Sequence, residues 1–225
     1  MKLNVINIFL FLSGVFQPGG LSAQDFDNFY FKEAQPRKEE SLTRFPSALR
    51  GLFKSDTDST KRLLITADSV SIEIPMVQYA TMHELSEKHY VFRDSVVVKP
   101  GGAELPCIQK HDTLFFVDFA RSVIFVADDK HTIRLADNKY VLSSMIGENK
   151  WDCLMLYREN DKICIAYFDF DKKIKEIDAN KKIEKVDSGT EKYYLANFKK
   201  KDFIKIMDGN YFPRKQYFHK RFDWQ

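Results

Sequence analysis

The segment His83-Glu84-Leu85-Ser86-Glu87 has the residue types that come closest to metal chemistry. A helical zinc-protease site needs histidines at its first and fifth positions, one turn apart, with a glutamate between them as general base. Here the fifth position is Glu87, and His89 follows two residues later. Because no third ligand stands out downstream, we interpret the segment as a charged connector. In an enzyme, His83, Glu84, Glu87 and His89 would be the first candidates for a site.

Two aspartate-rich segments resemble the start of a calcium loop. Residues 56–60, Asp-Thr-Asp-Ser-Thr, place oxygen-bearing side chains at positions 1, 3 and 5. Position 6 is Lys61 instead of glycine, and position 12 is Ala67 instead of glutamate. Asp169-Phe170-Asp171 departs from the pattern in a similar way. We therefore interpret both segments as turns that carry carboxylates.

The motifs of nucleophilic catalysis and of phosphate binding are absent from the sequence. It contains no Gly-x-Ser-x-Gly elbow and no glycine-rich phosphate loop. Cys107 and His111 are close in sequence, but nothing else recommends them as a catalytic pair. We predict no catalytic, cofactor-binding or metal-binding residue, and a hydrolase ranks below the binding functions considered below.

The three cysteines, Cys107, Cys153 and Cys164, leave at least one free thiol. The hairpin expected over 151–168 places Cys164 opposite Tyr157, about 13 Å along the strand from Cys153 and too far to bridge. Any disulfide must therefore join Cys107 to Cys153 or to Cys164. The alternative is that all three are small buried hydrophobic residues.

Residues 1–23 are typical of a cleavable secretory signal peptide. Lys2 precedes an apolar run over 5–16, and Leu21-Ser22-Ala23 offers a small residue before the expected new N-terminus at Gln24. The run is shorter than the ~20 apolar residues that span a bilayer. Cleavage would change the net charge from +3 to +2, which argues against nucleic acid as a partner. We predict an exported protein, periplasmic or extracellular, with no transmembrane segment after cleavage.

The remaining chain predicts an all-β fold. Residues 24–47 are a polar lead-in segment with scattered aromatic residues, and residues 48–225 are expected to form a single β domain. We expect a mainly antiparallel meander that forms a barrel or barrel-like sandwich, with a short C-terminal helix over 199–208 and a helical turn over 82–88. The strands are expected at 48–54, 62–67, 70–76, 89–98, 113–119, 122–127, 131–136, 139–145, 151–158, 163–169, 173–178, 181–187, 192–197 and 211–223.

Two strand regions are apolar on both faces, which predicts burial on both sides. Residues 151–157 and 163–168 should pair about Asn160-Asp161, with Met155 opposite Ala166. The run 113–119 behaves in the same way. Burial on both sides implies a central strand that a second layer covers, or a barrel wall with something packed outside it. The C-terminal stretch 211–224 interleaves basic and aromatic residues, which the alternation of a closing strand explains.

Some segments resemble exported proteins of the Bacteroidota. The leader that ends Ser-Ala-Gln, the stretch Leu49-Arg-Gly-Leu-Phe-Lys-Ser-Asp56, Tyr140-Val-Leu142 and Trp151-Asp-Cys-Leu-Met-Leu156 are similar to uncharacterised β-rich, lipocalin-like members of that group. The resemblance covers residues 48–223 and implies a meander that closes into a barrel. It implies no catalytic residues.

The function that we predict from the sequence is binding without catalysis. The preferred role is an exported protein that binds a small apolar ligand or an envelope partner. The alternatives are a protein–protein interaction or assembly factor of the cell envelope, a hydrolase, or a small outer-membrane barrel. A ligand carrier should enclose an apolar cavity of at least about 300 Å³. An assembly factor could use the lead-in segment or a sheet edge.

Overall fold

The computed structural model describes residues 28–168, 183–189, 191–208 and 211–220. Within these residues, sixteen strands form one mainly antiparallel sheet, accompanied by two short α-helices. The expectation of a mainly antiparallel β-protein is confirmed. The strands are β1 (Asn28–Phe31), β2 (Ser41–Leu42), β3 (Gly51–Ser55), β4 (Arg62–Ile65), β5 (Ser69–Thr81), β6 (Val91–Arg93), β7 (Val96–Val98), β8 (Glu104–Lys110), β9 (Thr113–Val126), β10 (His131–Ala136), β11 (Lys139–Gly147), β12 (Lys150–Glu159), β13 (Lys162–Tyr167), β14 (Ile183–Asp187), β15 (Lys192–Ala196) and β16 (Arg214–Lys220). The helices are α1 (Met82–Glu87) and α3 (Lys200–Asp208), and a 3₁₀ turn covers Ser47–Leu49.

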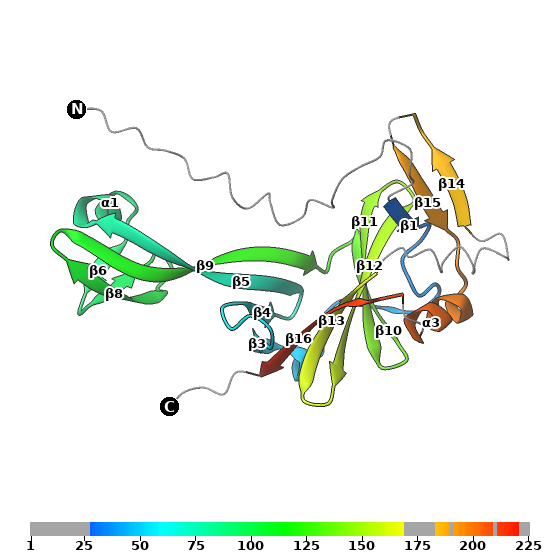
Figure 1. Ribbon diagram of the computed structural model, residues 1–225, viewed down its shortest axis with the longest axis horizontal. Helices are drawn as coiled ribbons and strands as arrows, with labels where there is room; N and C mark the ends of the chain where they lie inside the picture. Colours follow the sequence, from blue (N-terminus) through cyan, green and yellow to red (C-terminus); the bar gives the residue numbers. More distant parts are fainter. Residues whose placement is uncertain (1–27, 169–182, 190, 209–210, 221–225) are drawn as a thin grey trace.

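The sheet is not closed into a barrel, which corrects that prediction. Its order runs β14-β15-β1-β12-β13-β16-β3-β4-β5-β9-β8-β7-β6, and β11, β10 and β2 branch from β12. Within the described residues no pairing joins β6 to β14. The physical reason is visible in Figure 1, where β5 and β9 leave the rest of the sheet together and carry β6 and β8 away from it.

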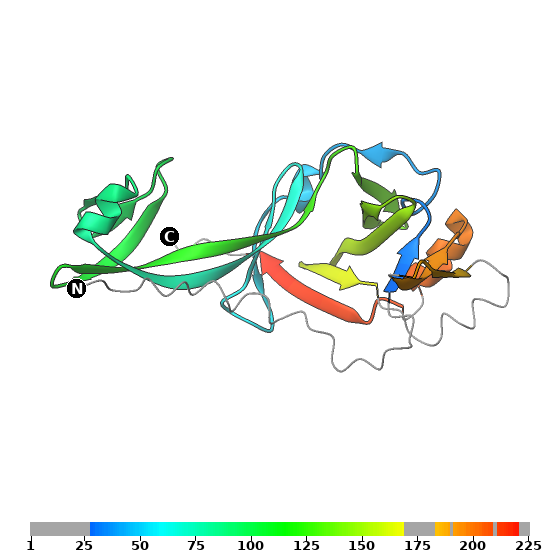
Figure 2. The same ribbon diagram turned by 90° about the horizontal axis from the view of Figure 1, so that it is seen from above.

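The molecule is therefore elongated, with a body and an arm (Figures 1 and 2). The arm is built on β5 and β9, which pair from Ser69 and Val126 in the body to Thr81 and Thr113 at the far end. Strands of this length reach about 40 Å. The sequence predicts two strands, 113–119 and 122–127, where one continuous strand of 14 residues forms. It also predicts no strand at 104–110, where β8 lies.

The body packs side chains on both faces of the β12–β13 hairpin, as the sequence predicts. Its register places Tyr157 opposite Cys164 and Met155 opposite Ala166. On one face of this hairpin, a cluster of buried side chains that includes Leu156, Ile163 and Phe218 forms the core of the body. On the other face α3 covers a second cluster, which it enters with Phe203, Ile206 and Met207. The expected strand over 173–178 lies outside the described residues.

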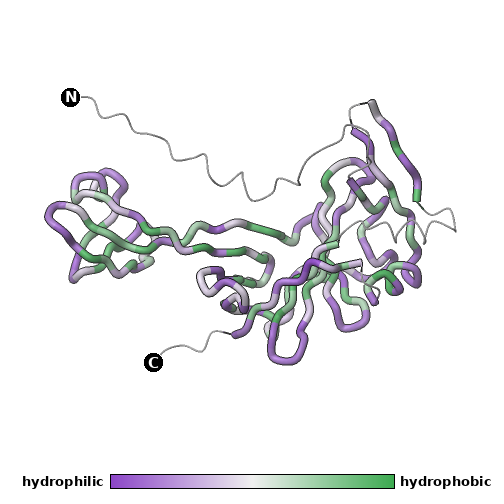
Figure 3. Tube along the Cα trace, viewed as in Figure 1, coloured by the Kyte–Doolittle hydropathy of each residue, from purple (hydrophilic) through white to green (hydrophobic). Residues whose placement is uncertain are grey.

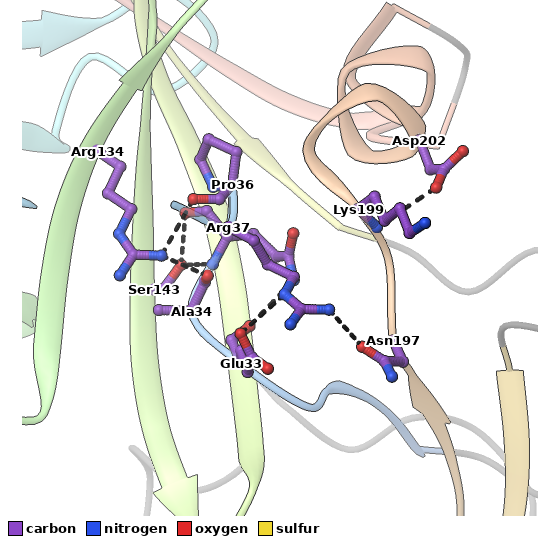
Figure 4. Close-up of polar contacts among 10 residues, drawn as sticks. Glu33, Ala34, Pro36, Arg37, Arg134, Ser143, Asn197, Lys199 and Asp202 are labelled. Carbon is purple, nitrogen blue, oxygen red and sulfur yellow. Dashed lines mark hydrogen bonds and ion pairs between the residues drawn. The ribbon is translucent and has the colours of Figure 1, made fainter. Parts of the chain in front are cut away.

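The N-terminal segment joins the body from Asn28 onward. Strand β1 lies between β15, to which it is parallel, and β12. Beyond it, Nη1 of Arg134 donates hydrogen bonds to the carbonyl oxygens of Ala34 and Pro36, and the backbone N–H of Gln35 donates to Oγ of Ser143 (Figure 4). The described part of the lead-in is thus held by strands β10 and β11. No helix within the described residues is long and apolar enough to cross a membrane.

Candidate functional site

The outer part of the arm, residues 77–117, forms a small module with its own core. We call it the distal module. Thr81 ends β5 and caps α1: its hydroxyl accepts a hydrogen bond from the N–H of Glu84, whose carboxylate accepts one from the N–H of Thr81. The cap turns the chain so that Leu85 of α1 lies over one face of the sheet. That inner face is apolar and buried, with Ala80, Val97, Leu105, Leu114 and Phe116 packed around Leu85.

The opposite face of the distal module is apolar as well, but no element that the structure describes covers it. Strands β5, β9 and β8 are in register here, with Val77 opposite Val117, Tyr79 opposite Phe115, and Phe115 opposite Ile108. Side chains that are directly opposite one another lie on the same face of a sheet. These five side chains define what we call the outer face, and their exposed fractions are 72% for Val77, 73% for Tyr79, 75% for Ile108, 39% for Phe115 and 43% for Val117. Figure 3 shows green, hydrophobic stretches on both long strands of the arm, with hydrophilic residues between them.

Aromatic rings occupy the middle of the outer face. The rings of Tyr79 and Phe115 have their centroids 6.3 Å apart and are tilted by 39°. Toward the body, the guanidinium of Arg62 lies 3.9 Å from the centroid of the Phe119 ring. Next to it, Arg121 donates to the carboxylate of Glu73 at 2.7 Å. Hence the apolar centre is bordered by charged groups on its body side, as in protein interfaces with a polar rim.

Charged residues border the outer face on its other side too. Glu104 and Lys110 stand at the two ends of β8, with Pro106 and Ile108 between them on the same face. Arg93 of β6 forms an ion pair with Glu104 at 3.1 Å, and both side chains are exposed. Lys110 forms no ion pair with any residue that the structure describes.

The residues that resemble a zinc motif lie on α1 of the distal module, away from the outer face. Nε2 of His83 lies 3.4 Å from the carboxylate of Glu87, and both side chains are exposed. Glu84 is engaged in the helix cap, and the hydrogen bond from the N–H of Thr81 holds the pKa of its carboxyl below the usual value. His89 follows the helix with a left-handed backbone. The described residues contain no group of three or more metal-ligating side chains.

The aspartate-rich loop 56–60 takes part in ion pairs and turn hydrogen bonds of the body. Asp56 accepts hydrogen bonds from Nζ of Lys162 at 2.6 Å and from Nδ1 of His219 at 2.8 Å. The Lys162 contact is the main cause that holds the pKa of Asp56 below its usual value. A neighbouring hollow of about 410 Å³ is lined by Arg158, Asn160, Asp161, His219 and Lys220. This lining is polar and charged, so it does not suit an apolar ligand. The other candidate loop, 169–171, lies outside the described residues.

The three cysteines are free and belong to different parts of the molecule. Cys107 packs against the core of the distal module, whereas Cys153 and Cys164 lie in the body core under α3. Burial raises the pKa of all three thiols, and for Cys153 the rise is large. The structure therefore agrees with the interpretation of the cysteines as packing residues, and it contains neither disulfide that the sequence left open.

The sequence contains a signal for the outer face that its interpretation missed. Residues 113–119 are apolar on both faces, which predicts two covering layers. The described part of the chain covers the inner face alone, whereas Phe115 and Val117 are exposed. The prediction of burial on both sides is wrong for this strand. The C-terminal strand alternates as expected, with Phe218 buried and Tyr217 and His219 on the other face.

In comparisons with known proteins, no protein-family model, no curated protein and no solved structure matches this chain.

Proposed function

We propose that this chain is a non-catalytic binding protein that attaches to a protein partner through the outer face of its arm. The observation that carries the proposal is a row of large apolar side chains, exposed by 39–75%, on an ordered sheet with a packed core behind it. Contiguous apolar patches of more than a few hundred Å² are uncommon on monomeric proteins, and those that occur are often binding sites.

The size of the patch supports a specific interface. At roughly 170 Å² for a fully exposed large side chain, the five residues of the outer face expose on the order of 500 Å² of apolar surface. At about 25 cal/mol per Å², its burial would contribute on the order of 12 kcal/mol before the entropic cost of association. An interface with this centre and the charged rim around it approaches the roughly 800 Å² per partner of a standard complex.

The packing of the body favours a binding surface on the outside of the molecule and argues against a ligand cavity inside it. In a ligand carrier, the apolar ligand would lie in the interior of the sheet. Here fully buried side chains occupy the interior of the body, among them Leu142, Leu156 and Phe218. The charged residues that resemble catalytic motifs are paired with neighbours at the surface. The interaction that we propose takes place in the cell envelope or outside the cell, and the likeness of residues 1–23 to a cleavable leader supports this part of the proposal.

The proposal can be tested by photo-crosslinking in the cells that naturally produce the protein. A photoreactive phenylalanine analogue at Tyr79 should give one discrete protein adduct after irradiation. The same analogue at Leu135, an apolar residue of the body that is 43% exposed, serves as the matched control and should give none. If position 79 forms no adduct, or the same adducts as position 135, the outer face is not the binding surface.

A further inference from the structure

We infer that the partner of the outer face is a second copy of this chain, bound in antiparallel orientation. This inference rests on the proposed function, because it names the partner of the same surface. It is carried by the order of residues along the exposed side of β8, which is Glu104, Pro106, Ile108 and Lys110. An acidic residue stands at one end, a basic residue at the other, and apolar residues lie between them.

This order is complementary to itself when it is reversed. A two-fold axis that runs between the two sheets, perpendicular to β8 and at the level of Cys107, lays one sheet on the other and places Ile108 of each copy over Pro106 of its partner. The same operation places Lys110 of each copy over Glu104 of its partner, so that each charge pair forms twice. Contacts that occur in symmetric pairs are the mark of an isologous dimer.

The distances allow these pairs. Packed sheets lie about 10 Å apart, which long side chains bridge from both sides. The angle of about 30° between packed sheets moves the ends of β8 sideways by only about 5 Å. Lys110 has no ion-pair partner in the described part of the chain, and Glu104 has only the exposed Arg93. Both groups are therefore available to a second copy.

The shape of the molecule leaves room for the second copy. The body joins the end of the arm at Ser69 and Val126, and the distal module with its outer face lies at the opposite end (Figures 1 and 2). Antiparallel stacking would bury the five side chains of the outer face from each copy. Because both contributing sheets carry their own core on the far side, the result is a sheet-on-sheet interface between two preformed modules.

The first test is the oligomeric state of the purified protein, measured by sedimentation equilibrium over a range of concentrations. We expect a dimer. Ile108→Glu, which puts a charge into the centre of the interface, should raise the dissociation constant at least about 30-fold. Ile146→Glu is the matched control, because Ile146 is 53% exposed but lies on β11 of the body, and it should leave the dimer unchanged.

The second test examines the orientation by exchanging charges. Lys110→Glu alone and Glu104→Lys alone should each weaken the dimer about tenfold, because both symmetric pairs become repulsive. A mixture of these two variants should recover association as a heterodimer, since one copy then carries only Glu at both positions and the other only Lys. Circular dichroism and a melting curve should show that every variant is folded.

The outcomes separate this inference from the proposed function. A monomeric wild-type protein, a dimer that resists Ile108→Glu, or a mixture that does not recover association each overturns the antiparallel dimer. The crosslinking result at position 79 in cells then tests the proposed function and the identity of the partner. An adduct with a different protein retains the proposed function and rejects the second copy, whereas the absence of any adduct rejects both.

Discussion

The reactivity of the three cysteines follows from where their side chains lie. Cys153 and Cys164 are 4% and 0% exposed in the body core, whereas Cys107 is half-buried on the distal module. Burial raises the pKa of each thiol, and only the thiolate reacts with alkylating reagents. We expect iodoacetamide at pH 8 to modify Cys107 at least about 100-fold faster than the other two, because buried thiols react only through opening of the fold. Peptide mass spectrometry over time measures these rates, and equal rates in the native protein would contradict the placement of the cysteines.

The pairing of Asp56 with Lys162 and His219 makes one contribution to stability depend on pH. Because the pKa of Asp56 is lower in the folded chain than in the unfolded one, its contribution is fully present above the unfolded value of about 3.9 and is lost as the pH falls through the folded value. Asp56→Asn removes the carboxylate, so it should destabilise the protein at pH 7 and lose this effect near pH 2. Urea unfolding at both pH values measures the difference.

Asp129→Asn is the control for this prediction. Asp129 is exposed, and no hydrogen bond or ion pair joins its side chain to the described residues. The substitution should change the free energy of unfolding by less than about 0.5 kcal/mol at either pH. A pH-independent effect of Asp56→Asn would mean that the carboxylate contributes through packing and not through its charge.

Strand β1 illustrates an element whose importance the sequence hides. Phe31 is 1% exposed, and its ring contacts those of Phe29, Phe168, Phe198 and Phe203. Phe31→Ala should lower the free energy of unfolding by about 3–5 kcal/mol, the range for a large aromatic side chain in a core. Leu135→Ala on β10, 43% exposed, should cost less than about 1 kcal/mol. Chemical denaturation compares the two, and a mild effect of Phe31→Ala would mean that the N-terminal segment is dispensable to the body.

The elements that the sequence predicts correctly are those with local signals. For the hairpin β12–β13, the predicted residue pairs agree with the observed ones, because Asn160-Asp161 marks the turn and apolar residues flank it on both sides. Strand β10 and helix α3 are also found, the former to the residue. The missed elements depend on distant partners. Strand β8 contains Pro106 and polar residues, and it forms only because β9 and β7 lie on its two sides.

The outer face could not be identified from the sequence because exposure depends on the fold as a whole. A strand that is apolar on both faces predicts two covering layers, and the body hairpin follows that rule. In β9 the same pattern occurs on an arm that extends beyond the body, and the described residues that cover it, from α1 onward, lie over one face alone. Two-sided apolarity therefore indicates either a core strand or a strand that another chain covers, and only the path of the sheet distinguishes these cases.

At the scale of the whole molecule, the body and the distal module have separate cores. The buried residues of the distal module form a cluster of their own, and β5 and β9 connect it to the body through a stretch in which neither β4 nor β8 pairs with them. A two-stranded ribbon without further layers is only marginally stable. We therefore expect the module and the body to open as separate cooperative units.

Two matched leucines test this separation, since Leu114 and Leu156 are both 0% exposed, the first in the distal module and the second in the body. Each change to alanine removes about 2–5 kcal/mol of packing from its own core. Leu114→Ala should raise the labelling rate of Cys107 and leave that of Cys164 unchanged, because the module opens while the body stays folded. Leu156→Ala should raise the rate of Cys164 in particular. If either substitution accelerates both thiols equally, the two cores unfold as one unit, and the arm cannot present its outer face independently of the body.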